Sequence, residues 1–326
     1  MTDLFEPNAP PEAASALARL RDADAAVRRI AVLDLADFED ETLVPALVSA
    51  LRDDAAPEVR REAAAVLAAW EQEDVVEALC AALLDVDAPV REAAQQALSE
   101  LKNLESAPVL RRWAARPEPF ARRAALRGLR ELRDAAAFEP ARAALDDADA
   151  EVRLEAVAVL GWLKDARALG PLAALTVTDA HVAVRRAAAG ALGFANADDA
   201  HAAPALLNAL RDADWQVREE AATTLGKLRA HPARDALVTA LADDYWQVRL
   251  RATRALGRLA DPHAADAVSA LLAHTISNLR KEAALALGEL GSAASIAPLR
   301  AALEDRDPEV RKAVRIALQQ LEGGAS

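Results

Sequence analysis

The sequence predicts an all-α fold, a right-handed solenoid (superhelix) of about ten two-helix repeats, and three observations carry this prediction. One short motif recurs along the chain: an apolar residue, an arginine, two variable residues, small residues and a leucine. Its period is close to 31 residues, which suits a pair of short helices and their turns. Finally, hydrophobic residues make up 53% of the 326 residues but aromatics only 3%, a composition typical of closely packed helices.

The recurring arginine fixes the register of the repeats. Two examples of the motif are Val59-Arg60-Arg61-Glu62-Ala63 and Val217-Arg218-Glu219-Glu220-Ala221. Successive arginines are separated by 31 to 33 residues, and the series is Arg28, Arg60, Arg91, Arg122, Arg153, Arg185, Arg218, Arg249, Arg280 and Arg311. The planar guanidinium pairs well with a carboxylate. We therefore expect a structural ladder in which these arginines bridge to turn aspartates of adjacent repeats.

Each repeat is predicted to contain two helices joined by a turn. In the second repeat, residues 43–51 form an apolar-periodic stretch, 53–57 a turn and 58–70 a second helix. Prolines suited to the first turn of a helix are Pro57, Pro89 and Pro308. In repeat seven the buried face of the second helix is predicted at Val217, Ala221, Leu225 and Leu228. Repeats four and nine lack the aspartate, so we expect the ladder to break there.

Five glycines recur at one position, directly after a leucine of the second helix. They are Gly161, Gly193, Gly226, Gly257 and Gly288. A glycine inside a helix costs about 1 kcal/mol relative to alanine. Their common register predicts close contact between neighbouring helices in repeats five to nine.

An aspartate shortly before Val-Arg, followed by Ala and Leu-Gly, occurs at Asp149 and again at Asp214. This pattern resembles the HEAT-like repeats first named for phycobilisome bilin lyases. The resemblance covers roughly residues 12–322 and implies one solenoid, with a polar, proline-rich segment at 1–11 and a short tail at 323–326. It also implies that second helices line the concave face. The family includes bilin lyases, a di-iron hydroxylase and many scaffolds, so the resemblance is specific for the fold and weak for the function.

Charge and composition narrow the classes of function. The formal net charge is −13, with 52 acidic and 39 basic side chains, which disfavours nonspecific binding to nucleic acids and anionic membranes. Charges interrupt every apolar run before it reaches transmembrane length. The first residues lack the pattern of a signal peptide. We therefore expect a soluble cytoplasmic protein that binds no membrane.

No catalytic or metal-binding pattern emerges. The five histidines show no HExxH spacing, and the sequence contains neither a glycine-rich phosphate loop nor a nucleophile elbow. The single cysteine, Cys80, lies on an apolar helix face and is expected to be buried. The resemblance implies His-Glu dipeptides for a di-iron enzyme, and the sequence has none. We expect no enzyme activity, no cofactor and no metal.

Positions three, seven and eleven of each second helix, counted from the apolar residue before arginine, lie opposite its buried stripe. Basic and aromatic residues gather at or beside these positions and in the preceding turns of repeats four to eight. Aromatic residues and arginine most often anchor protein interfaces. The predicted partner-binding residues are Arg123, Arg127, Trp162, Arg186, Phe194, Trp215, Lys227, Tyr245, Trp246, Arg251, Arg254 and Arg258.

For Trp162 and Phe194 a role in filling the stack is as consistent with the sequence as a surface role. Trp215 and Trp246, two residues before Val-Arg in their repeats, are predicted to lie in turns at the surface. The leading hypothesis is a non-catalytic scaffold or adaptor that binds a partner protein, acidic or with apolar anchors, on the concave face. One alternative is an accessory factor for attachment or maturation of a cofactor or chromophore, like a bilin lyase. Another is a nucleic-acid binder with an arginine-lined groove.

Overall fold

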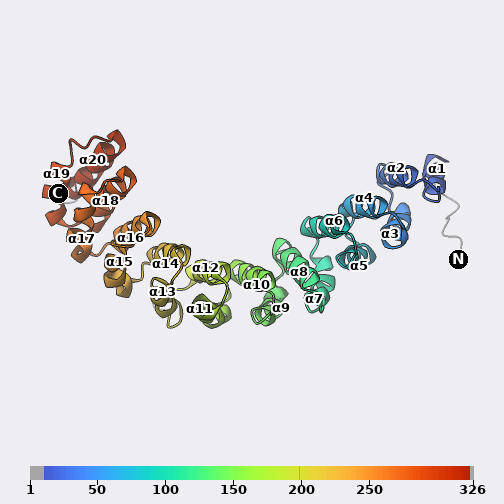
Figure 1. Ribbon diagram of the computed structural model, residues 1–326, viewed down its shortest axis with the longest axis horizontal. Coiled ribbons are helices and arrows are strands. Elements are labelled where there is room, and N and C mark those ends of the chain that lie inside the picture. Colours follow the sequence, from blue (N-terminus) through green and yellow to red (C-terminus); the bar gives the residue numbers. More distant parts are fainter. Residues whose placement is uncertain (1–10, 198, 324–326) are drawn as a thin grey trace. The chain divides into compact units, whose positions relative to one another are not determined.

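The computed structural model describes residues 11–197 and 199–323. All regular secondary structure assigned in these stretches is helical (Figure 1). Residues 1–10 and 324–326, which hold most of the predicted N-terminal segment and tail, lie outside the described residues. Within the chain, two compact units are formed by Met1–Val159 and Leu160–Ser326. We call them unit 1 and unit 2.

Unit 1 consists of helix pairs in which a first helix is followed by a second helix packed against it. The pairs are α1 (Pro11–Arg19) and α2 (Ala25–Ala36), α3 (Val44–Asp53) and α4 (Pro57–Val66), α5 (Glu73–Ala82) and α6 (Ala88–Ser99), and α7 (Ala107–Trp113) and α8 (Pro119–Glu131). They are followed by α9 (Phe138–Ala144) and α10 (Ala150–Leu163), and the last residues of α10 belong to unit 2.

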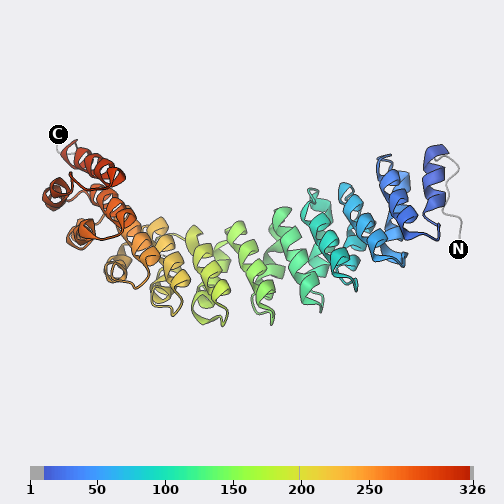
Figure 2. The same cartoon turned by 45° about the horizontal axis from the view of Figure 1, so that its top comes forward.

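Unit 2 continues the same pattern. Its pairs are α11 (Leu169–Thr178) and α12 (Val182–Ala191), α13 (Ala202–Ala209) and α14 (Trp215–Leu228), α15 (Arg234–Ala240) and α16 (Trp246–Leu259), α17 (Ala265–Ser269) and α18 (Ser277–Leu290), and α19 (Ile296–Ala301) and α20 (Pro308–Gly323). The second helices α12, α14, α16, α18 and α20 pack side by side in chain order (Figures 1 and 2). The predicted all-α solenoid of two-helix repeats is thereby confirmed.

The helix bounds differ slightly from those expected in the second repeat. The first helix begins at Val44 and continues to Asp53, beyond the predicted end at residue 51. The second begins one residue early, at Pro57, and changes to a 3-10 turn over Leu67–Ala69 before ending. Proline at the first helical position needs no hydrogen-bond acceptor, which explains why the helix begins there.

Three glycines of unit 2 lie where neighbouring second helices approach closely. An ideal Cβ on Gly226 would lie 2.7 Å from the Cα of Ala255. The corresponding distances are 2.9 Å from Gly257 to Ala286 Cα and 3.0 Å from Gly288 to Ala317 Cα. Backbone atoms cannot move aside as a flexible side chain can. The predicted tight helix contact is confirmed at these three positions.

Gly193 does not follow this rule. Its ideal Cβ would meet the flexible side chain of Lys227, 2.9 Å from Nζ, and no backbone atom is among its nearest neighbours. The predicted buried stripe of α14, in contrast, is confirmed in full: Val217, Ala221, Leu225 and Leu228 are all buried.

A ladder of arginine–aspartate pairs connects successive repeats. Arg218 donates from Nε and Nη2 to the two carboxylate oxygens of Asp243, at 2.7 and 3.0 Å. Its Nη1 donates to the backbone carbonyls of Asp212 and Ala213 in the turn before its own helix. The same carboxylate pairing joins Arg28 to Asp54, Arg60 to Asp85, Arg122 to Asp147, Arg185 to Asp212 and Arg280 to Asp305.

The remaining arginines of the series also donate to carbonyls of the preceding turn, and they are Arg91, Arg153, Arg249 and Arg311.

The aspartates of the ladder and the arginines that pair with them are mostly buried. Burial by itself would raise the pKa of Asp243, but hydrogen bonds from Arg218 and from the backbone N–H of Tyr245 outweigh it and hold that pKa below its ordinary value. Each charged pair is therefore kept ionised while it joins two repeats.

Repeats four and nine replace the ladder aspartate by other residues. In repeat four the position is occupied by Arg116, and the guanidinium of Arg91 lies 5.9 Å from the ring centroid of Phe120. In repeat nine His274 takes the position, and its Nδ1 accepts a hydrogen bond from the backbone N–H of Ile276 at 3.0 Å. Burial, together with the charges of Arg249 and Arg280, lowers the pKa of His274.

The substitution in repeat nine leaves one ladder arginine incompletely paired. The Nε of Arg249 is buried and has no hydrogen-bond partner among the residues that the structure describes. A neutral imidazole that already accepts from Ile276 offers no second acceptor in the geometry of a carboxylate. Repeat nine is therefore a weak step in the ladder.

Replacing His274 by aspartate is expected to raise the free energy of unfolding of unit 2 by about 1–2 kcal/mol, because a carboxylate there would accept from Arg249. The free energy is measured by urea unfolding monitored with circular dichroism. Thr275→Asp is the control, since it adds the same charge at the neighbouring exposed position. A His274→Asp protein no more stable than the wild type, or a control with the same gain, would contradict this explanation.

Candidate partner-binding surface

The exposed sides of α12, α14, α16 and α18 form what we call the second-helix face of unit 2. At the edge where these helices begin, three aromatic residues gather. Trp215 and Trp246 are the first residues of α14 and α16, and Tyr245 is the N-cap residue of α16. Both tryptophans thus lie at the start of a helix and not within a turn as predicted. We call Trp215, Tyr245 and Trp246 the aromatic edge.

Two rings of the aromatic edge are held in place by stacking. The rings of Trp215 and Tyr245 are nearly parallel, with centroids 5.3 Å apart and an interplanar angle of 10°. The guanidinium of Arg218 lies 5.7 Å from the Tyr245 centroid. Because Arg218 is fixed by its pair with Asp243, the ladder also helps to orient the Tyr245 ring and, through it, the Trp215 ring.

Two rings of the aromatic edge remain partly accessible to solvent. Tyr245 is 45% exposed and Trp246 is 38% exposed, whereas Trp215 is half-buried. Exposure of that size is unusual for rings of large apolar area, which most proteins cover. A surface that combines exposed rings with a fixed backbone is suited to anchor a partner at small entropic cost.

Most of the predicted basic residues on this face are paired with carboxylates. Arg254 donates from Nε and Nη2 to the two oxygens of Glu282, at 2.7 and 2.8 Å. Arg251 donates from Nε to Glu219 at 3.0 Å. Each pair joins neighbouring second helices, so these arginines contribute to the stack as well as to the surface.

Two of the predicted cations, Lys227 and Arg258, are exposed and take part in no ion pair with the described residues. Arg186 lies 3.8 Å from Glu220, measured from Nε to Oε2. Burial raises the pKa of Glu220, and the charge of Arg186 opposes that rise only in part. Among the predicted cations of this face, the positive charge without an ion pair to the described residues therefore lies at Lys227 and Arg258.

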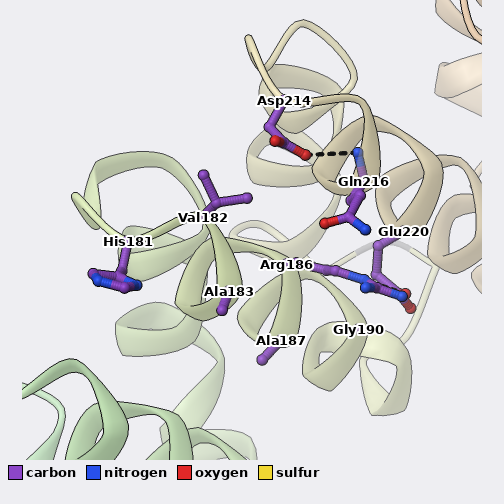
Figure 3. A pocket seen from close by; sticks show the side chains of 9 residues that line it. All are labelled: His181, Val182, Ala183, Arg186, Ala187, Gly190, Asp214, Gln216 and Glu220. Atoms are coloured by element: carbon purple, nitrogen blue, oxygen red, sulfur yellow. Dashed lines mark hydrogen bonds and ion pairs between the residues drawn. The ribbon is translucent and has the colours of Figure 1, made fainter.

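A hollow of about 700 Å³ lies between α12 and the first turns of α14 (Figure 3). Its floor is formed by small residues of α12, namely Ala183, Ala187 and Gly190. Figure 3 shows Arg186 extending from α12 towards Glu220 of α14. The small side chains explain why the helices leave space here, and the hollow continues the second-helix face next to the aromatic edge of α14.

The other predicted binding residues are distributed more widely. Trp162, near the end of α10, is 42% exposed, while Phe194 is half-buried in the 3-10 turn after α12. Arg123 and Arg127 lie on α8 in unit 1. Arg123 lies over the Phe120 ring, 5.2 Å from its centroid, and Arg127 is exposed.

Sequence reasoning missed the carboxylates that pair with the arginines of the second-helix face. Glu219 and Arg251 are 32 residues apart, so they stand at nearly equivalent positions of adjacent repeats with opposite charge. Glu219 is at position three of its second helix and Arg251 at position four, so the signal that would have indicated this pair is opposite charge at neighbouring positions of adjacent repeats.

The single cysteine and any group of side chains that could hold a metal ion are two features of interest for chemistry. Cys80 is buried on α5, and burial, with a contribution from Glu77, raises the pKa of its thiol far above the ordinary range. This confirms the expected buried cysteine. Among residues 11–197 and 199–323, no group of three or more His, Cys, Asp or Glu side chains could hold a metal ion. No helix in the part of the chain that the structure describes is long and apolar enough to cross a membrane.

Comparison with known protein families gives a match to the model for HEAT repeats. The matched segments are residues 13–99, 44–129, 107–181, 171–247 and 234–319, which together span most of the chain. No curated protein matches the sequence.

Several solved structures are similar in fold. An engineered protein shares 22% identity over 96% of this chain and 99% of its own, with a TM-score of 0.57. YibA of Escherichia coli shares 20% identity over 78% of this chain and 94% of its own, with a TM-score of 0.60. Kap95p, solved in a study of its binding to RanGDP, shares 14% identity over 94% of this chain, with a TM-score of 0.67. The chain spans about 50% of the length of Kap95p. At these identities the likeness concerns the fold alone.

Proposed function

This chain belongs to the HEAT-repeat family, and we propose that it is a non-catalytic scaffold that binds another protein on the second-helix face of unit 2. HEAT-repeat solenoids generally act as scaffolds for protein interactions. The observation that carries the proposal is the aromatic edge, where Tyr245 and Trp246 remain exposed beside the stacked Trp215.

The chemistry of the aromatic edge is that of an interface anchor. Tryptophan, tyrosine and arginine dominate the residues whose truncation costs a complex about 2 kcal/mol or more. The stack of Trp215 on Tyr245 and the nearby Arg218 limit the rotamers available before binding. Side chains that are already ordered lose less entropy when a partner covers them. The second-helix face adds exposed cations to these rings.

The double variant Tyr245→Ala with Trp246→Ala tests the proposal. Tagged wild-type and variant proteins are used to capture partners from the native lysate, and the eluates are compared by mass spectrometry. We expect at least one stoichiometric protein that the wild type retains and the variant loses by about tenfold or more. Both side chains are exposed, so the fold should persist, which circular dichroism verifies.

The control is the double variant Ile30→Ala with Leu104→Ala, which removes two exposed apolar side chains from unit 1. It should retain the partner at the wild-type level. Equal retention by all three proteins, or no stoichiometric partner, would contradict the proposal. The absorbance spectrum of the eluate and its nucleic-acid content report on the two alternatives, a chromophore-handling factor and a nucleic-acid binder.

A further inference from the structure

A small recess lies between α14 and α16 on the second-helix face. Its volume is about 90 Å³, and its lining consists of Ala222, Thr223 and Gly226 from α14 and Arg251, Arg254, Ala255 and Arg258 from α16. Gly226 and Ala255, where the backbones of α14 and α16 approach closely, form part of its lining. We call it the arginine recess.

The three arginines of the recess project from one side of α16. At 100° per residue, positions 251, 254 and 258 fall within an arc of about 60°. Arg251 uses only Nε for its bond to Glu219, and Arg254 uses Nε and Nη2 for Glu282. Each guanidinium has five N–H groups. Several donors of Arg251 and Arg254 thus remain outside these bonds.

Arg258 differs from its two neighbours because it is exposed and has no ion pair among the described residues. Lys227 of α14 is also exposed, but its Nζ lies at Gly193 of the preceding repeat, so the charge without an ion pair at the recess itself is that of Arg258. The chain as a whole carries a formal net charge of −13. A basic recess in an acidic protein is suited to select an acidic group locally, not to attract anions over long range.

We propose that the arginine recess accepts the carboxylate of an aspartate or glutamate side chain from an acidic segment of the partner protein. This inference rests on the proposed scaffold function. A recess of about 90 Å³ admits a carboxylate group, and guanidinium forks match its geometry. Glu219 and Glu282, which pair with Arg251 and Arg254, and Glu289, whose charge interacts with Arg258, disfavour a continuous polyanion such as a nucleic-acid backbone, whose every unit carries charge.

The distance to the aromatic edge gives the spacing of the partner's residues. Trp246 and Arg254 are eight residues apart on one helix, which corresponds to about 12 Å along its axis. An extended peptide advances about 3.3 Å per residue. The acidic residue of the partner should therefore lie about three to four residues from the apolar residue that contacts Trp246.

The test uses the full chain and a fluorescein-labelled synthetic peptide with one leucine, a glycine–serine spacer of about three residues and a pair of glutamates. A second peptide carries glutamines in place of the glutamates. Fluorescence anisotropy at low salt gives both affinities. We expect the glutamate peptide to bind about tenfold or more tightly than the glutamine peptide. Arg258→Glu should remove about tenfold of the affinity for the glutamate peptide.

The matched control is Arg211→Glu, which makes the same change of charge at an exposed arginine just after α13. It should leave the affinity within about twofold of the wild type. Equal binding of the two peptides, no binding of the glutamate peptide, or equal losses in both variants would overturn the proposal. The scaffold function is judged separately, because partner capture depends on the aromatic-edge variants and not on the synthetic peptides.

Discussion

Replacing Asp243 by alanine should lower the free energy of unfolding of unit 2 by about 2–4 kcal/mol. The variant leaves the Arg218 guanidinium without its carboxylate while its side chain stays only 14% exposed. Removing one partner of a largely buried pair costs more than the pair itself contributes, because the remaining charge is poorly solvated. The variant also removes the acceptor for the backbone N–H of Tyr245.

The neighbouring residue provides the control for this variant. Asp244 is exposed, and Asp244→Ala removes the same charge and the same number of atoms. Urea unfolding of both variants should show a loss for Asp243→Ala and a change within about 0.5 kcal/mol for Asp244→Ala. Similar unfolding curves for the two variants would show that the arginine–aspartate ladder contributes little to the stability of unit 2.

Replacing Gly226 by alanine should destabilise unit 2 by about 1–3 kcal/mol, although alanine is the better helix former. The added Cβ would lie 2.7 Å from Ala255 Cα and 2.8 Å from Ala255 Cβ, distances that force α14 and α16 apart. Intrinsic helix propensity favours the substitution by about 1 kcal/mol, so the sign of the change reports directly on the helix contact.

Gly170→Ala is the matched control, because its ideal Cβ finds only the His201 ring, at 3.9 Å. It should be neutral or stabilising by up to about 1 kcal/mol. Thermal unfolding of the two alanine variants measures the difference. A Gly226→Ala protein as stable as Gly170→Ala would mean that neighbouring second helices separate at little cost.

The repeat period made the fold predictable from sequence. A motif spaced by about 31 residues, with proline at helix starts and glycine in register, determines which segments become helices and which faces they bury. The contact of Gly226 with Ala255 follows from the same register, because glycine inside a helix is retained where backbones meet. These features are local or recur from repeat to repeat. A single sequence therefore contains several independent examples of the pattern that predicts the helices and their buried faces.

The candidate site was less predictable, because it depends on differences between repeats. The pairing of Arg254 with Glu282 requires the rotamers of two long side chains on neighbouring helices, which a helical wheel does not give. The stack of Trp215 on Tyr245 joins residues at different offsets in their repeats, at the first helical residue and at the N-cap. Whether a carboxylate offsets the charge of a predicted arginine also depends on its neighbours. Glu282 pairs with Arg254, whereas Arg258 has no ion pair among the described residues.

The arginine–aspartate ladder and the aromatic edge contact each other at Tyr245. Its backbone N–H donates to Asp243, which pairs with Arg218, and the Arg218 guanidinium lies over the Tyr245 ring. Stability and recognition therefore share residues at the start of α16. Tyr245→Ala removes the ring and keeps the backbone N–H that donates to Asp243, whereas Asp243→Ala removes the acceptor itself.

Hydroxyl-radical footprinting of the protein with its captured partner tests the central claim most directly. In the free protein, the exposed Tyr245 and Trp246 should be oxidised readily, as should the exposed Ile30 and Leu104 of unit 1. With the partner bound, oxidation of Tyr245 and Trp246 is expected to fall several-fold, while that of Ile30 and Leu104 stays unchanged. Unchanged oxidation of Tyr245 and Trp246 in a complex that is fully formed would contradict binding at the second-helix face of unit 2.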